Sequence, residues 1–360
     1  MGTVCSPRDA SSGRPIATFR RTNKAAFEAA FLEVLLLARE SGLLRLGTVS
    51  IDGAKIEANA SKIRSVRYDR AQALREKLAA DIAELTAKAE AADAEDSDPQ
   101  ALPAEIARRE ALTAKLDAAC ARLEAEAKAR AEAERPEYEA KKAAYDARKG
   151  RRGRPPKPHD GTPPADRQIN LTDPDSQLMR KSQAHEYRQA YNAQAVVCAE
   201  GSQLILATNM ATTPSDQPTF AATILAMEHT IGLPQTVLAD AGFASGAAVA
   251  KLEARQIEPL VAIAKTQPHR PYDFRPPPKP KPERRIREPW RLAMKIKLQS
   301  EEGKARYKKR KQTVEPVFGI IKSAIGFTRF RLRGRQKVAL EWLLVALAYN
   351  CRRLHNLRLA

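Results

Sequence analysis

A long stretch rich in Ala, Glu, Lys and Arg constrains this chain most strongly, because it fills residues 68–149 in the middle of the sequence. Its apolar residues recur at spacings of three and four, as the buried face of a helix requires. They fall into two sets on either side of EDSDPQALP: Leu74, Leu78, Ile82, Leu85 and Ala89, then Ile106, Leu112, Leu116, Cys120, Leu123 and Ala127. The pattern predicts an antiparallel coiled-coil hairpin. Such a hairpin would be either an arm for dimerisation or DNA clamping, or a spacer.

The segments around this hairpin predict a mixed α/β fold with helices packed on a sheet. Before it, a helix over residues 23–41 precedes a strand that ends near Asp52-Gly53. After it, alternating patterns and turn residues predict further elements. These are a β-hairpin at 193–198 and 204–208, a helix capped by Ser215 or Asp216, a strand ending at Asp240, a helix, the strand EPLVAI, a basic Pro-rich loop from His269 to Arg287, a helix from Pro289, and a last helix over 336–357.

The charge of the chain favours a polyanionic partner. The formal net charge is +19, from 62 Lys and Arg against 43 Asp and Glu. Nucleic acid is the most common partner of such a surface, and an anionic membrane is a less common one. No apolar run approaches the roughly 18 residues of a membrane span, and the N-terminus lacks the apolar core of a signal peptide. The four cysteines form no CxxC pair, which excludes a zinc site or a disulfide framework. These features predict a cytoplasmic protein.

Three carboxylates stand at the ends of predicted elements. Asp52 and Asp240 end strands, and Glu315 follows the basic run RYKKRKQTV. Oxygen ligands next to basic side chains suit Mg²⁺ or Mn²⁺ together with a phosphate group. A helix cap or a salt bridge also explains each acid taken alone. Pro316 fits the first turn of a helix capped by Thr313, which would make ARYKKRK a separate or kinked helix.

Four motifs in order resemble the DDE transposases of bacterial insertion sequences. They are VSIDGAKIEANAS, YNAQAVV, LADAGF, and EPVFGIIK with GFTRFRLRG. The chain is similar to the IS-four/IS-five group, in its branch with a coiled-coil insertion, from about Ala17 to the C-terminus. The resemblance implies an RNase H-like fold in which Asp52, Asp240 and Glu315 are the catalytic acids and bind two Mg²⁺ or Mn²⁺ ions. It also implies DNA as partner, both element ends and target, a homo-oligomer, and a nucleoid-associated location in bacterial cytoplasm.

The family also carries a Tyr and an Arg before the Glu and a Lys after it. Lys322 matches the last of these. Lys308 and Lys311 stand where the Tyr and the Arg are expected, while Tyr307 and Arg310 are each one residue away. One residue turns a helix face by about 100°. The offset residues would therefore lie on a different face from those of the family. Among the basic residues of this segment, Lys322, Lys311 and Arg310 are the candidate DNA contacts.

Two further basic motifs have alternative readings. RRGRPPK resembles an AT-hook, in which Arg152 and Arg154 would enter a narrow minor groove. The alternative is a basic linker, because short basic runs of Pro and Gly are common. In FTRFRLRGRQK, Arg329 and Arg333 are candidate phosphate contacts, or else solvated residues between core phenylalanines.

The expected organisation has six segments: an N-terminal helical remnant (1–45), the first part of the catalytic domain (46–66), the coiled-coil insertion (67–148), the AT-hook-like linker (149–166), the second part of the catalytic domain (167–335) and a C-terminal helix (336–360). Members of the branch usually carry a longer region before ATFRR, so we expect a truncated copy whose activity is an open question. The resemblance predicts a transposase. The alternatives are a catalytically silent copy that competes for DNA, and a non-specific nuclease of the same fold.

Overall fold

The computed structural model describes residues 19, 22–94, 101–147, 154–158, 160–180, 185–211, 213–263 and 286–359. The chain divides into two compact units. The first consists of Met1–Asn59, Met179–Glu186 and Ala190–Ala360, and the second of Ala60–Leu178 and Tyr187–Gln189. Among the described residues, no helix combines the length and the apolar character that crossing a membrane requires. The division into six segments stays a prediction.

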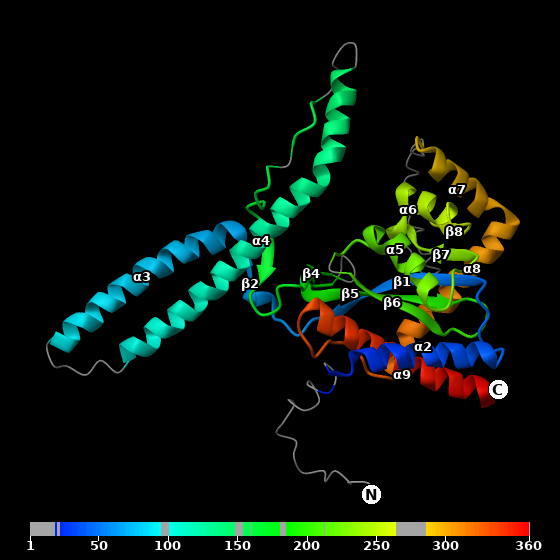
Figure 1. Ribbon diagram of the computed structural model, residues 1–360, viewed down its shortest axis with the longest axis horizontal. Coiled ribbons are helices and arrows are strands. Elements are labelled where there is room, and N and C mark those ends of the chain that lie inside the picture. The colour runs from blue at the N-terminus through cyan, green and yellow to red at the C-terminus, as the bar shows by residue number, and fades with distance from the viewer. Residues whose placement is uncertain are drawn as a thin grey trace, which may run out of the picture. The chain divides into compact units, whose positions relative to one another are not determined.

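The first unit is built on a mixed β-sheet (Figure 1). Strand β1 pairs antiparallel with β5 and parallel with β7, while β6 pairs with β5 and β8 with β7. The antiparallel β5–β6 pair confirms the predicted hairpin. Across the sheet these five strands lie in the order β6-β5-β1-β7-β8, which is compatible with an RNase H-like arrangement. Their bounds are β1 Thr48–Glu57, β5 Arg188–Cys198, β6 Ile205–Ala211, β7 Thr236–Ala239 and β8 Glu258–Val261, and the short β4, Gln177–Met179, lies where the chain returns from the second unit.

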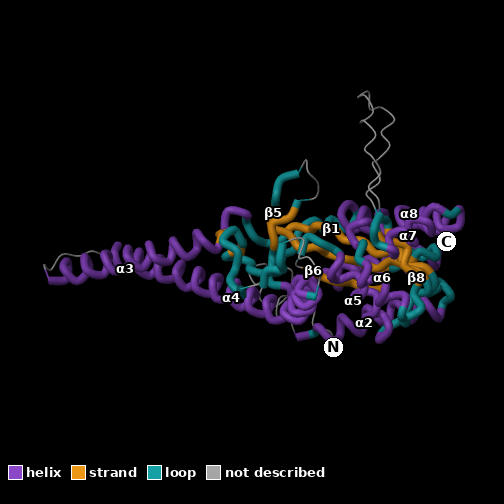
Figure 2. The backbone as a smooth tube through the Cα atoms, turned by 90° about the horizontal axis from the view of Figure 1, so that it is seen from above, coloured by secondary structure: helices purple, strands orange, loops and turns teal. Residues whose placement is uncertain are grey.

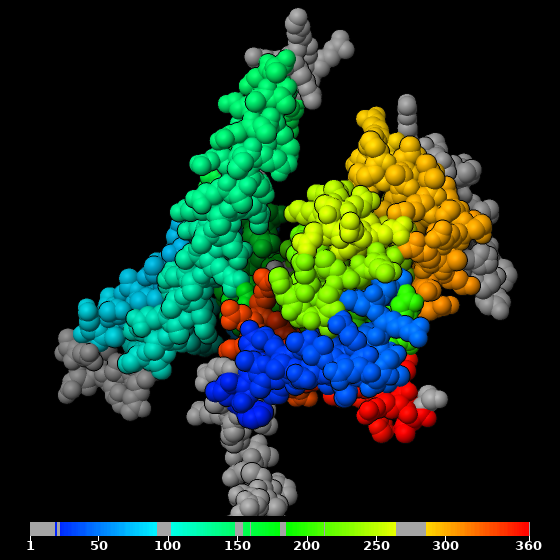
Figure 3. All heavy atoms as spheres, turned by 45° about the vertical axis from the view of Figure 1, so that its right-hand side comes forward, coloured from blue at the N-terminus to red at the C-terminus, as the bar shows by residue number. Residues whose placement is uncertain are grey.

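Helices cover this sheet on both faces (Figure 1). Helices α5 and α6 pack on β6 and β8, α8 packs on β1 and β7, and α9 packs on β6. Figure 3 shows α2, in blue, beside α9, in red. The bounds are α2 Lys24–Glu40, α5 Phe220–Leu225, α6 Gly246–Glu253, α7 Pro289–Gln299, α8 Glu301–Ser323 and α9 Arg335–Leu359. Short 3₁₀ turns occupy Gln217–Thr219, Ala226–His229 and Ala241–Phe243. The predicted helices are thus present, while residues 264–285 of the predicted basic loop lie outside the described residues.

Trp342 of α9 joins three elements of the core. Its ring stacks on Phe318 of α8 with 5.9 Å between centroids, and it is fully buried. Its indole Nε1 donates a hydrogen bond to the carbonyl oxygen of Gln194 in β5 at 2.9 Å. A buried Trp needs such a partner for its N–H. The position of α8, which carries Glu315, is therefore tied to β5 through α9.

Strand β1 is longer than the sequence pattern indicated, so the expectation that it ends at Asp52-Gly53 is wrong. Antiparallel pairing with β5 continues to Glu57. The parallel partner β7 pairs with β1 only as far as Ser50. Asp52 therefore lies inside a continuous strand, just beyond the part that β7 covers.

Helix α8 is continuous from Glu301 to Ser323, so the expectation that Pro316 lies in the first turn of a separate helix is also wrong. Its cap is Ser300, whose hydroxyl accepts a hydrogen bond from the Gly303 amide at 3.0 Å. Thr313 is no cap, because its hydroxyl donates to the Lys309 carbonyl at 2.7 Å.

A side chain from another segment compensates for Pro316 inside α8. Proline has no N–H, so the carbonyl of Gln312, four residues earlier, loses its helical donor. Gln203, in the turn between β5 and β6, donates a hydrogen bond from its side-chain amide to this carbonyl at 2.9 Å. The helix continues because the carbonyl remains paired.

The second unit contains two long helices that pack on each other, as Figure 2 shows. They are α3, Tyr68–Ala94, and α4, Ala101–Asp146, with Pro136 inside α4. A two-stranded sheet of β2 (Ser65–Arg67) and β3 (Gln168–Asn170) lies with them. The buried core contains only some of the predicted apolar positions, and its members are Val66, Ala71, Leu78, Leu116, Ala119, Cys120, Leu123 and Ile169. The predicted helix pair is present, whereas the coiled-coil assignment stays a prediction.

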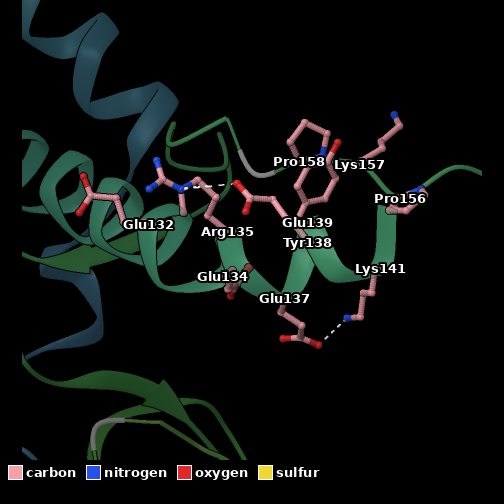
Figure 4. A pocket seen from close by; sticks show the side chains of 11 residues that line it. Glu132, Glu134, Arg135, Glu137, Tyr138, Glu139, Lys141, Pro156, Lys157 and Pro158 are labelled. Atoms are coloured by element: carbon pink, nitrogen blue, oxygen red, sulfur yellow. Dashed lines mark ion pairs between the residues drawn. The ribbon is translucent and has the colours of Figure 1, made fainter. Parts of the chain in front are cut away.

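A cavity of about 570 Å³ lies in the second unit, between the C-terminal part of α4 and residues 156–158 (Figure 4). Charged side chains on α4 dominate its lining. They pair within the helix, Arg135 with Glu139 at 3.9 Å and Lys141 with Glu137 at 2.5 Å. Pairs four residues apart are typical of a solvated helix surface.

The compensation at Pro316 can be tested with Gln203→Asn. Asn tolerates the positive φ of 54° at this position, but it is one methylene too short to reach the Gln312 carbonyl. We expect the free energy of unfolding to fall by about 1 kcal/mol. In a Pro316→Ala background, the restored N–H donates to the same carbonyl, so the same change should cost about half as much or less. Urea unfolding measures both losses, and equal losses would contradict this account of α8.

Candidate active site

Two aspartates are aligned by the parallel pairing of β1 with β7. The register sets Ser50 opposite Leu238. Because side chains alternate along strands, the same alignment two residues further on sets Asp52 beside Asp240 on one face. Strand β7 ends just before Asp240, as predicted, and the Asp240 carboxylate accepts a hydrogen bond from the Gly242 amide at 2.7 Å. The structure thus brings together two of the three acids named from the sequence.

The environment of Asp52 disfavours its negative charge. Burial raises the pKa of Asp52 from 3.8 to about 6, and the charge of Asp240 adds to the rise. A hydrogen bond from the Gly53 amide at 2.7 Å and the nearby Arg310 act in the opposite direction. A buried acid with a raised pKa beside a second carboxylate is typical of functional sites.

Arg310 of α8 lies between Asp52 and Glu315. Its guanidinium is 3.4 Å from Asp52 Oδ2 and 3.5 Å from Glu315 Oε1. The Arg310 side chain is only 11% exposed, and its buried Nε has no hydrogen-bond partner among the described residues. The Glu315 side chain is 53% exposed. The third predicted acid is therefore linked to the first through an arginine.

Sequence reasoning missed Asp216 and Lys55. Asp216 was expected to cap a helix, but its side chain makes no capping hydrogen bond. It accepts hydrogen bonds from Asn192 Nδ2 at 2.6 Å and Gln194 Nε2 at 2.8 Å, and it lies 3.9 Å from Lys55 Nζ. Burial lowers the pKa of Lys55, while the charges of the three aspartates oppose that effect. The motif YNAQAVV contained the signal, since its two amides share one face of a strand.

Helix α8 presents Tyr307 and Arg310 to the site, despite their one-residue offset from the family spacing. The Tyr307 hydroxyl donates to the Ala239 carbonyl at 3.0 Å, next to Asp240. Burial raises the pKa of Tyr307. Lys308 and Lys311, which match the family spacing, are exposed. Residues three apart share a helix face, so Tyr307 and Arg310 point to the sheet together.

The other predicted DNA contacts lie apart from the two aspartates. Lys322 lies over the Phe318 ring, 5.8 Å from its centroid. Arg329 donates to the Ala58 carbonyl at 3.3 Å, and Arg333 donates to the Asn59 carbonyl at 2.9 Å. Both arginines remain exposed.

The two basic motifs differ in what the structure shows of them. In FTRFRLRGRQK, Phe330 is a buried core residue. Its ring packs edge-on against Tyr191 of β5. Arg152 of the AT-hook-like motif lies outside the described residues, and Arg154 is exposed in the second unit.

The chemistry of the acidic pair fits a hard divalent cation. Within the described ranges, no group of three or more His, Cys, Asp or Glu side chains is arranged to hold a metal ion. Asp52 and Asp240 nevertheless supply the oxygen ligands that Mg²⁺ and Mn²⁺ prefer. Burial and the neighbouring charge of Asp240 raise the pKa of Asp52, and a bound cation would stabilise the ionised form of both carboxylates. Glu315 would have to leave Arg310 to join them.

Comparison with known proteins identifies one family. Its sequence profile, described as "Transposase DDE domain", matches residues 164–351, just over half of the chain. The match contains Asp240 and Glu315, whereas Asp52 precedes it. No curated protein and no solved structure matches the chain.

The raised pKa of Asp52 makes stability depend on pH. Between pH 3.8 and about 6, the folded state holds a proton that the unfolded state has released, so ionised Asp52 destabilises the fold above pH 6. Without divalent cations, Asp52→Asn should exceed wild type in free energy of unfolding by up to about 3 kcal/mol at pH 8. The difference should vanish near pH 3.5. Urea unfolding across this range checks it, and a difference independent of pH would be inconsistent with the raised pKa.

Proposed function

The chain belongs to the transposase DDE domain family, and from this premise we propose that it is a DNA transposase of a bacterial insertion sequence. The proposal extends to the IS-four/IS-five group and its branch with a coiled-coil insertion. The observation that carries it is the alignment of Asp52 with Asp240 by the β1–β7 register. A pair of partly buried carboxylates, one inside β1 and one just after β7, is a suitable place for metal-assisted phosphodiester chemistry.

Asp52, Asp240 and Glu315 are the proposed catalytic acids and ligands of two Mg²⁺ or Mn²⁺ ions. Bound ions would activate a water or a 3′-hydroxyl and stabilise the leaving oxygen of the phosphodiester. Arg310 supplies the positive charge between Asp52 and Glu315, at 3.4 and 3.5 Å. Because the Glu315 side chain is half exposed, it is free to change rotamer without disrupting the core.

Basic side chains on the same unit are the proposed DNA contacts. Lys322, Lys311 and Arg310 lie on the helix that carries Glu315, and Arg329 and Arg333 follow it. The hydrogen bonds that Arg329 and Arg333 make to backbone carbonyls orient their guanidinium groups. Contacts of this kind position DNA without reading its sequence. Handling two element ends together would require a homo-oligomer.

One observation favours the alternative of a silent DNA-binding copy. Glu315 contacts Arg310, and no metal-binding group of three acids is assembled among the described residues. If this arrangement persists on DNA, the chain would bind element ends without cutting them.

Cleavage and joining of duplex DNA taken from the flanks of the gene separate these functions. The assay compares wild type with Asp240→Asn and Glu315→Gln, in Mg²⁺ or Mn²⁺. The matched control is Glu301→Gln, an exposed acid at the other end of α8. We expect cleavage at one terminal position and joining of the 3′ end, both reduced at least about a thousandfold by either active-site change. The control should act as wild type.

Other outcomes of this assay are equally informative. Binding without cleavage by every protein would establish the silent copy. Cleavage at many positions without joining would establish a nuclease.

The charge of the long helices argues against DNA clamping by the α3–α4 arm. Residues 68–146 contain 13 Lys and Arg against 19 Asp and Glu, a net charge of −6 in a chain of +19. DNA affinity comes mainly from phosphate contacts by basic side chains. We therefore propose that this arm contacts protein.

Removal of the tip of the arm tests this assignment. Replacing residues 82–108 by a short Gly/Ser turn keeps the buried positions at Leu78 and Leu116. DNA affinity and its salt dependence should stay within about twofold of wild type, because the removed charges make no phosphate contacts. Fluorescence anisotropy with a salt series measures both. A large loss of affinity with a shallower salt slope would show that the arm clamps DNA.

A further inference from the structure

Asp216 approaches β1 from the face opposite to α8. Asp52 points toward Arg310 of α8, and because side chains alternate along a strand, residue 53 points to the other face. Residue 53 is a glycine. A Cβ atom there would lie 2.8 Å from Asp216 Oδ1 and 2.5 Å from Asn192 Oδ1. The missing side chain lets Asp216 lie directly against the strand that carries Asp52.

Asp216 is held in this place by three side chains. Its Oδ1 accepts both amide hydrogen bonds, from Asn192 at 2.6 Å and from Gln194 at 2.8 Å. Both amide side chains are fully buried. Lys55, 3.9 Å away, is fixed by donating to the Pro214 carbonyl at 3.0 Å. Asp216 is itself only 15% exposed, so its position is tightly determined.

The arrangement leaves one buried acceptor unpaired. Asn192 Oδ1 has no hydrogen-bond partner among the described residues, while the Nδ2 of the same amide donates to Asp216. Turning the amide over would place its oxygen against the Asp216 carboxylate. The charge-assisted bond is the stronger one, so the carboxylate sets the orientation. A buried unpaired atom in a native structure calls for a reason beyond packing.

Asp216 also contacts the turn that carries Asp240. A Cβ atom on Gly242 would lie 3.3 Å from Asp216 Oδ2. The Gly242 amide donates to Asp240 Oδ1 at 2.7 Å, just as the Gly53 amide donates to Asp52 Oδ1 at 2.7 Å. Asp216 thus packs on the two glycines whose amides orient the two proposed catalytic aspartates.

We propose that Asp216, with its counter-ion Lys55, is a positioning residue of the candidate active site. It fixes Gly53 and Gly242 from the side of β1 opposite to α8, and the amides of these glycines hold the carboxylates of Asp52 and Asp240 in place. This inference rests on the proposed function and assigns Asp216 no contact with DNA.

The first test compares Asp216→Asn, Lys55→Met and the double variant. Asn keeps an oxygen that can accept the two amide bonds, so it removes mainly the charge. The strand-cleavage rate at saturating DNA should fall about a hundredfold in each single variant, because small displacements of reacting groups are costly. DNA affinity should stay within about twofold, and the double variant should be no slower than the slower single, as coupled residues require.

The matched control is Glu200→Gln. Glu200 accepts a hydrogen bond from the Thr48 amide at 3.0 Å, at the other end of the same strand. Its replacement should lower stability without changing the rate at saturating DNA. An unchanged rate in Asp216→Asn, or a loss that appears only as weaker DNA binding, would overturn the inference.

Hydrogen exchange tests the inference without any catalysis. Asp216→Asn should speed exchange of the Gly53 and Gly242 amides at least about fivefold beyond the change in core amides, because local opening is separate from global unfolding. Glu200→Gln should show no such local increase. If wild type cuts no DNA, the proposed transposase activity fails. The hydrogen-exchange comparison alone then decides whether Asp216 is a positioning residue. Equal exchange at both glycines in wild type and Asp216→Asn would refute it.

Discussion

The parallel pairing of β1 with β7 is the constraint on which the candidate site depends. Its register aligns Asp52 with Asp240. The pairing stops at Ser50, so Asp52 and Asp240 both lie just beyond the paired residues of β1 and β7. Strand β5 continues to pair with β1 past this point and keeps Asp52 on a rigid element. Rigid elements hold reacting groups more accurately than loops do.

Charge balance around these strands follows from the same geometry. Arg310 approaches Asp52 from the α8 face, and Lys55 with Asp216 lies on the opposite face. Burial, together with the charges of Asp240 and Asp216, outweighs the hydrogen bond from Gly53 and the charge of Arg310, which is why the pKa of Asp52 rises to about 6. The site is therefore arranged to attract further positive charge, and Glu315 is positioned to respond through Arg310.

Sequence patterns predicted the elements that local interactions determine. The helix around Leu35, the β5–β6 hairpin and the end of β7 before Asp240 follow from periodicity and turn residues. The length of β1 was not predictable, because β5, more than a hundred residues away, sustains it. The continuity of α8 likewise depends on Gln203. The role of Asp216 was hidden for the same reason: its partners come from β1 and β5, whereas the local pattern indicated only a cap.

Iron-mediated cleavage of the protein backbone tests the central claim most directly. Fe²⁺ bound in place of Mg²⁺, with ascorbate and peroxide, generates radicals that cut the chain beside the metal ligands. In the complex with DNA, the account predicts cuts next to Asp52, Asp240 and Glu315 that excess Mg²⁺ suppresses and Asp240→Asn abolishes. Cuts confined to other positions, or cuts that persist in Asp240→Asn, would show that these acids do not form the metal site.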